Sequence, residues 1–250
     1  SGTATQVAAA AELDRLNTTQ LKGDFGATIT GTATTTELSQ IYNRTSATIN
    51  ATGVTAINGS AADVHTAIDH AQVNHDTNFT VTISGTSAAA ADLKAIDAIT
   101  SGIITATGVE TITGSLSDVG DVVDVDTNKG TAGQQIDIDT DYNVTLSDTG
   151  NMSASALNTL NGKVPGTLTV TNAVTLTGTA SDIATAASAD NAGTLALAAN
   201  FGATVSLGAV DAADLITIYG QTSATIDATA ATGINGSAAN VHTVIDHAQV

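Results

Sequence analysis

The feature that most constrains this chain is a long internal repeat. Residues 45–73, TSATINATGVTAINGSAADVHTAIDHAQV, return with few changes as residues 222–250, TSATIDATAATGINGSAANVHTVIDHAQV, at an offset of 177 residues. Self-similarity at a fixed period is typical of arrays in which each unit buries its apolar face against its neighbours. We therefore expect one complete cassette over residues 2–177 and the start of the next over residues 178–250, as part of a longer array.

A shorter period lies inside the long one. Its mark is an apolar residue, a small polar residue, glycine, and then usually serine or threonine. The mark begins at Ile29, Ile57, Ile83, Ile112, Leu176 and Ile234. It varies at Leu146, where Asp148 replaces the glycine, and at Leu207, which Gly208 follows directly. The marks divide the cassette into six units of about 26 to 34 residues.

Helix starts follow most of the marks. Ser60, Ser115, Thr179 and Thr34 are followed three residues later by Asp63, Asp118, Asp182 and Glu37, respectively. A hydroxyl that caps the first amides, with an acidic group at the third helical position, predicts a helix N-terminus. Apolar residues then recur at helical spacing, which predicts a short helix with one narrow apolar stripe. These residues are Val64 and Ile68, Leu38 and Ile41, Leu93 and Ile96, Leu157 and Leu160, Leu215 and Ile218.

Before each mark the sequence is rich in threonine and β-branched residues, which favour strands. Residues 47–58 and 168–177 each hold two such runs around a Thr-Gly or Thr-Asn pair, which predicts a tight hairpin. A unit with two paired strands advances about 9.6 Å, close to the roughly 8–10 Å between packed helices. The favoured fold is therefore a repeat solenoid of strand-turn-strand-helix units in the α/β class. A parallel β-solenoid, with the helical segment as a corner, is the alternative.

Charge limits the partners of the chain. It has 6 Lys and Arg against 24 Asp and Glu, a formal net charge of −18 at pH 7. Nucleic acids and anionic membranes are bound mainly through Lys and Arg, so we expect neither as a partner of this chain. No stretch of 18 or more apolar residues is present, so we also expect no membrane insertion.

The acidic segment 118–148 contains candidate calcium ligands. Asp124, Asp126 and Asn128 have the alternating spacing of a calcium loop, but Gly130 comes one position late and no glutamate closes the loop. The alternative places Asp137, Asp139 and Asp141 on one solvated strand face, where a cation would relieve their repulsion. Calcium is the one cofactor that the sequence suggests.

No pattern in the sequence indicates catalysis. A Gly-rich phosphate loop, a nucleophile elbow and paired cysteines are all missing from it, so we expect no enzyme activity. His65 with Asp69, and His242 with Asp246, are one helical turn apart and could share a metal, although two ligands do not make a site. Exposed polar residues on a helix are the favoured interpretation.

Threonine runs offer a further binding hypothesis. Residues 80–82 and 167–171 would place outward threonine rows on a sheet, a surface that ordered water or ice recognition can use. The favoured interpretation is that threonine simply suits exposed strand positions.

Two stretches carry a resemblance to known proteins: VTLTGTASDIATAASADNAGTLAL at residues 174–197 and SDTGNMSASALNTLNGK at residues 147–163. With them, the whole chain resembles the very large Thr/Ala/Gly-rich, Lys-poor repeat proteins secreted by cyanobacteria and marine proteobacteria. The resemblance implies a surface-layer, adhesin or extracellular-fibre role. We therefore expect a structural component of an extracellular filament, fibre or cell-surface layer that binds further copies of itself. The alternative is an adhesin stalk, or a surface-binding module for ice or cation-bridged surfaces, with a tip domain elsewhere.

Overall fold

The computed structural model describes residues 1–127 and 135–247, which form an α/β protein of repeated strand-helix units. The helices are α1 (Ala4–Arg15), α2 (Thr35–Tyr42), α3 (Ala61–Ile68), α4 (Ala90–Ile99), α5 (Leu116–Thr127), α6 (Ala154–Asn161), α7 (Ala180–Ala192), α8 (Ala212–Tyr219) and α9 (Ala238–Ile245). The chain divides into an N-terminal part, residues 1–112 and 121–140, and a C-terminal part, residues 113–120 and 141–250. A unit is one helix together with the strands that precede it in the chain, and each unit is named by its helix.

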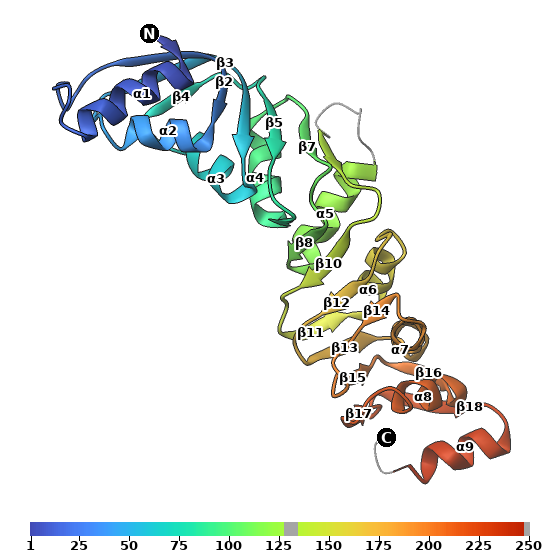
Figure 1. Ribbon diagram of the computed structural model, residues 1–250. Helices are drawn as coiled ribbons and strands as arrows, with labels where there is room; N and C mark the ends of the chain where they lie inside the picture. The colour runs from blue at the N-terminus through green and yellow to red at the C-terminus, as the bar shows by residue number, and fades with distance from the viewer. Residues whose placement is uncertain (128–134, 248–250) are drawn as a thin grey trace. The chain divides into compact units, whose positions relative to one another are not determined.

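In the N-terminal part, parallel strands of successive units lie side by side (Figure 1). The strands are β1 (Gly2–Thr3), β2 (Ala27–Thr34), β3 (Ile49–Gly59), β4 (Val73–His75), β5 (Thr80–Ile83), β6 (Ser87–Ala89), β7 (Ile104–Ala106), β8 (Thr111–Gly114) and β9 (Ile136–Ile138), of which β8 extends into the C-terminal part. One sheet runs in the order β1-β2-β3-β5-β7-β9, with β4 also paired to β3. Ile57 lies beside Val81, and Val81 beside Ile104, so equivalent residues stack from unit to unit.

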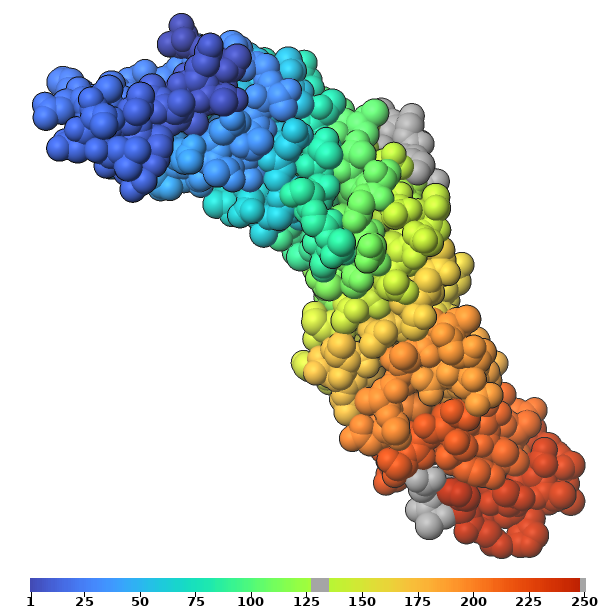
Figure 2. Space-filling model, viewed as in Figure 1, coloured from blue at the N-terminus to red at the C-terminus, as the bar shows by residue number. Residues whose placement is uncertain are grey.

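The C-terminal part repeats this arrangement in several smaller sheets. Its strands are β10 (Asn143–Leu146), β11 (Gly150–Ser153), β12 (Leu168–Val170), β13 (Val174–Gly178), β14 (Leu195–Ala196), β15 (Gly202–Val205), β16 (Gly208–Asp211), β17 (Ile226–Asp227) and β18 (Ala231–Asn235). They pair as β14-β12-β10, as β11-β13-β15-β17 and as β16-β18. Helices α6 to α9 contact one another in chain order. Within each part, units contact mainly the units beside them. The colours in Figure 2, which follow residue number, therefore change gradually along each part.

The core is a row of small and branched apolar side chains between strands and helices. All ten apolar residues expected on the helix stripes are buried, which confirms the stripe. The strands contribute alternate residues, as in β12, where Leu168 and Val170 are buried and Thr169 is half-exposed. Full burial of one such side chain contributes about 1.5–3 kcal/mol, so each unit depends on a handful of residues.

The expected hairpins are wrong. Residues 47–58 lie almost entirely in the single strand β3, and the two runs of residues 168–177 are β12 and β13, which belong to different sheets. Every strand pair given above is parallel and joins two units. Each sheet therefore gains one strand per unit, a step of about 4.8 Å, whereas packed helices need roughly 8–10 Å. The expected match between the two layers is also wrong.

The expected helix starts are confirmed. The backbone amides of Glu37, Asp63, Asp118 and Asp182 each donate to the hydroxyl three residues earlier, at 3.0 to 3.2 Å. Of these four residues, only Glu37 also bonds back to the backbone of the cap, because its carboxylate accepts a hydrogen bond from the Thr34 amide at 2.9 Å. Aspartate is one methylene shorter, and the carboxylate of Asp63 instead accepts from the Ser60 hydroxyl at 2.7 Å.

The units fall into two classes that alternate along the described chain. In direct units a glycine immediately precedes the helix N-cap: Gly2 and Thr3 before α1, Gly59 and Ser60 before α3, Gly114 and Ser115 before α5, Gly178 and Thr179 before α7, and Gly236 and Ser237 before α9. In spaced units an extended segment separates the two residues: Gly31 and Thr34 before α2, Gly85 and Ala89 before α4, Gly150 and Ser153 before α6, and Gly208 and Asp211 before α8. The true structural period is thus a pair of units.

Spaced units share a second device. A buried threonine after the helix donates its hydroxyl to the carbonyl of an aromatic residue at the start of the unit: Thr45 to Phe25 at 2.6 Å, Thr100 to Phe79 at 2.5 Å and Thr222 to Phe201 at 2.5 Å. The bond ties the two ends of the unit together. In the α6 unit, buried Tyr142 and Val164 lie in the corresponding places.

The cap of α2 should make stability depend on pH. Burial disfavours the Glu37 carboxylate, but bonds from Thr5 and Thr34 outweigh burial and lower its pKa below the ordinary 4.5. A lowered folded-state pKa stabilises the fold above the ordinary pKa, and this contribution is lost as pH falls through the folded-state value. Glu37→Gln should therefore cost about 0.3–1 kcal/mol at pH 7 and progressively less as the pH falls through the folded-state pKa, in urea titrations followed by circular dichroism.

Helix α1 supplies the matched control, because Gln6 already makes the same reciprocal cap with Thr3. Gln6→Glu should stabilise the protein at pH 7 and not at pH 3. An equal cost of Glu37→Gln at both pH values would contradict the electrostatic account.

Candidate assembly interface

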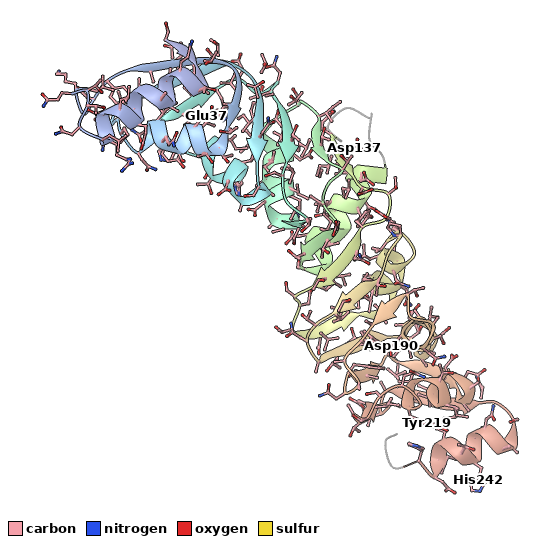
Figure 3. All side chains as sticks on the ribbon, in the orientation of Figure 1. Glu37, Asp137, Asp190, Tyr219 and His242 are labelled. Atoms are coloured by element: carbon pink, nitrogen blue, oxygen red, sulfur yellow. The ribbon has the colours of Figure 1, made fainter. Side chains whose placement is uncertain are left out.

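The pair α8 and α9 reproduces the pair α2 and α3. Helix α2 begins at Thr35 and α8 at Ala212, an offset of 177 residues, and α3 and α9 have the same offset. Tyr42 stacks on His70 with ring centroids 4.0 Å apart and planes at 13°. Tyr219, at the end of α8 (Figure 3), stacks on His247 at 3.8 Å and 15°. The α9 unit thus packs on α8 as the α3 unit packs on α2, and equivalent surfaces face onward.

The onward surface of the α3 unit is covered by the next unit. Strands β4 and β5 both pair with β3, and α4 packs against α3. Under this cover Ile57 is 1% exposed and Ile68 is 4% exposed. The surface is therefore part of the core.

A hydrogen bond between two side chains crosses the same joint. His65 Nδ1 on α3 lies 2.8 Å from Asp92 Oδ1 on α4, and both side chains are about one-quarter to one-third exposed. Asp92 is the third residue of its helix, where a carboxylate is also favoured by the helix dipole. In place of the suggested metal shared with Asp69, the structure gives His65 a contact with Asp92 of the next unit.

Within the described part of residues 1–247, no further unit lies over the equivalent surface of the α9 unit. We call it the C-terminal face, formed by Ile234, His242, Ile245 and the groove beside β18. Ile234 is 37% exposed and Ile245 is 68% exposed, although their counterparts Ile57 and Ile68 are buried. The groove has a volume of about 580 Å³ and is lined by Val210, Leu215, Ile234 and the segments 225–229 and 231–233. Among the described strands, β17 pairs only with β15 and β18 only with β16.

His242 occupies the position of His65 on this face (Figure 3). Its Nδ1 lies 3.1 Å from Asp246 Oδ2 on its own helix, and the two side chains are 74% and 67% exposed. An exposed pair of this kind contributes about 0–1 kcal/mol.

The C-terminal face combines apolar side chains, an exposed imidazole and strand β18, which pairs with β16 alone among the described strands. Covering one of its isoleucines fully would contribute about 1.5–3 kcal/mol, and an added strand would satisfy the backbone of β18.

The first group of calcium candidates lies on or after α5. Asp126 Oδ1 accepts a hydrogen bond from the Ile138 amide at 2.9 Å and so ties α5 to β9. Asp124 is exposed on the same helix. Asn128 lies outside the described residues.

The second group does not share a strand face, so that expectation is wrong. Strand β9 ends at Ile138, and of the three only Asp137 is on it (Figure 3). Asp139 Oδ1 accepts from the Thr140 amide at 2.6 Å, and Asp141 is exposed in the following loop. Within residues 1–127 and 135–247, no three acidic or histidine side chains gather closely enough to hold a metal. Calcium binding stays a prediction.

The outward threonine rows are short in the described structure. On β5, Thr80 and Thr82 are exposed, and Thr82 lies beside half-exposed Thr105 of β7. On β12, Thr169 lies beside Thr145. Two threonines side by side are a common feature of exposed strands.

Sequence reasoning missed three features of the unit joints: the alternation of direct and spaced units, the bonds from threonine to aromatic carbonyls, and the His65–Asp92 pair. The second had a visible signal, since Phe25, Phe79 and Phe201 are each followed after about 20 residues by threonine. The marks at Leu146 and Leu207, which vary from the others, both lie in spaced units.

Comparisons of the chain with protein-family models, with curated proteins and with solved structures found no match. In the part of the chain that the structure describes, no helix combines the length and apolar character needed to cross a membrane.

The repeat allows a matched test of the open face. Ile57→Ala should cost about 2–5 kcal/mol because it leaves a cavity between two units. Ile234→Ala, the same change 177 residues later, should cost less than about 1 kcal/mol because that side chain is partly in water. Urea titrations followed by circular dichroism measure both, with Ile68→Ala and Ile245→Ala as a second pair. Equal costs within either pair would show that the C-terminal face is covered in solution.

Proposed function

We propose that this chain is a structural protein whose units stack as a solenoid and build an extracellular filament, fibre or cell-surface layer. The observation that carries the proposal is the pairing between successive units. The strands of each described sheet come from different units, and β4, β5 and α4 of one unit cover the α3 unit. An arrangement of this kind extends by adding further units of the same kind.

Several properties of the chain agree with such a role. Backbone ladders run from unit to unit, and a thin core of Ala, Val, Ile and Leu follows them. A formal net charge of −18 keeps a long array dispersed in water and disfavours binding to nucleic acid or anionic membranes. The partners of the chain are therefore further copies of its own units, and the proposal includes no catalytic step.

Imaging of the native material tests the function. Gold-labelled antibodies raised against residues 45–73 should decorate cell-surface filaments or layers at regular intervals in electron micrographs. Labelled isolated rods that end in globular heads would overturn the proposal in favour of an adhesin stalk. Label confined to the cell interior would overturn the extracellular location.

Calcium is the remaining part of the proposal and has its own test. If the acidic segment 118–148 binds calcium, removal of the ion with a chelator should lower the melting temperature, by about 2–4 °C for each kcal/mol of binding energy lost from a chain of this length. Asp124→Asn together with Asp137→Asn should abolish the difference, while Asp24→Asn, an exposed aspartate outside the segment, should leave it. An unchanged melting temperature after chelation would remove calcium from the account.

A further inference from the structure

We propose that a pocket between α2 and α3 binds a small primary amine through its ammonium group. The two helices lie side by side (Figure 1), and the pocket between them has a volume of about 110 Å³. It is lined by Thr35, Thr36, Ser39 and Tyr42 of α2 and by Asp63 and Thr66 of α3. The polar atoms of these side chains are all oxygens, and one of the side chains is a carboxylate. The inference does not depend on whether the array forms filaments.

The pocket offers hydrogen-bond acceptors. The hydroxyls of Ser39 and Thr66 each donate, at 2.8 Å, to a backbone carbonyl of their own helix, which leaves the lone pairs of both oxygens available. Asp63 Oδ2 accepts from the Ser60 hydroxyl at 2.7 Å, and a carboxylate has room for further donors. Thr35 is only 8% exposed, and its hydroxyl has no hydrogen-bond partner within the described residues. An ammonium group, with three donors and a positive charge, matches this set.

Two other joints between a spaced unit and the next direct unit place a donor of the protein at this point. The donor is the fifth residue of the first helix, which in α2 is Ser39. In α4 this residue is Lys94, whose Nζ lies 2.7 Å from Asp121 Oδ2 on α5. In α6 it is Asn158, whose Nδ2 donates to the Asp182 carbonyl on α7 at 2.8 Å. The Ser39 side chain turns back to its own helix, so the pocket lies where α4 supplies an ammonium group.

The partners on the second helix correspond as well. Asp121 is the sixth residue of α5, as Thr66 is of α3, and Asp182 is the third residue of α7, as Asp63 is of α3. An amine in the pocket would therefore connect α2 to α3 as Lys94 connects α4 to α5. The formal net charge of −18 also raises the concentration of small cations near the chain.

The joint between α8 and α9 provides a natural control within the same chain. Its residues Ala212, Ala213, Ile216 and Asn240 lie 177 positions after Thr35, Thr36, Ser39 and Asp63. Three hydroxyls and the carboxylate are thus replaced by apolar groups and an amide. This joint should not bind an amine.

The test titrates the full, isotope-labelled chain with methylammonium chloride and follows the backbone amide signals by nuclear magnetic resonance. Potassium chloride and tetramethylammonium chloride at equal concentrations are the controls, because neither cation donates a hydrogen bond. We expect saturable shifts of the amides around Ser39 and Asp63 with methylammonium alone, and none in α8 and α9. The absence of a saturable shift, or the same shifts with either control salt, would overturn the inference.

Two variants test the residues of the pocket. Asp63→Asn should keep the fold, because the second copy has Asn240 in the same cap, with its amide donating to Ser237 Oγ at 3.2 Å. It should weaken methylammonium binding by about threefold or more, the scale of a partly exposed ion pair. Ser39→Lys supplies an ammonium group from the chain itself, so it should abolish the saturable shifts and raise the melting temperature. Unchanged methylammonium binding in either variant would also overturn the inference.

Discussion

The backbone ladder between successive units is the interaction on which this structure depends. Each strand pair in the sheets described above joins two different units, and parallel pairing leaves no unit able to satisfy its own strands. The apolar residues obey the same rule, since Ile57 is buried only because the following unit lies over it. Stability therefore comes from the contacts between units rather than from any single unit, and a unit without a neighbour lacks part of its core and of its backbone pairing.

Local features of the fold could be predicted from the sequence, and pairing partners could not. Caps and apolar stripes are decided within about ten residues, so Ser60 and Asp63 identified the start of α3 correctly. Gly53 suggested a hairpin turn, but it lies inside β3, between two register shifts in the pairing with β2, for another reason. A side chain there would place its Cβ 2.7 Å from the Thr30 methyl group on the neighbouring strand. Glycine marks close approach between units at this position, and a single unit carries no sign of it.

The candidate interface was harder to predict for the same reason. The partner of His65 is 27 residues away in the sequence, and no local pattern connects it to Asp92. What reveals the joint is the structure of the α3 unit, which β4, β5 and α4 of the next unit cover. The calcium candidates show the opposite limit: spacing suggested a ligand set, but the bond from the Ile138 amide gives Asp126 a structural task that spacing alone did not contain.

The alternation of direct and spaced units has a consequence for how such a gene changes in length. Recombination between similar repeats can delete or duplicate any whole number of units. Loss of one unit would bring two units of the same class together, a joint that does not occur along the described chain. Loss of two units would restore every contact. Length variants that fold should therefore differ by even numbers of units. The smallest viable change in the length of such a gene is then one pair of units.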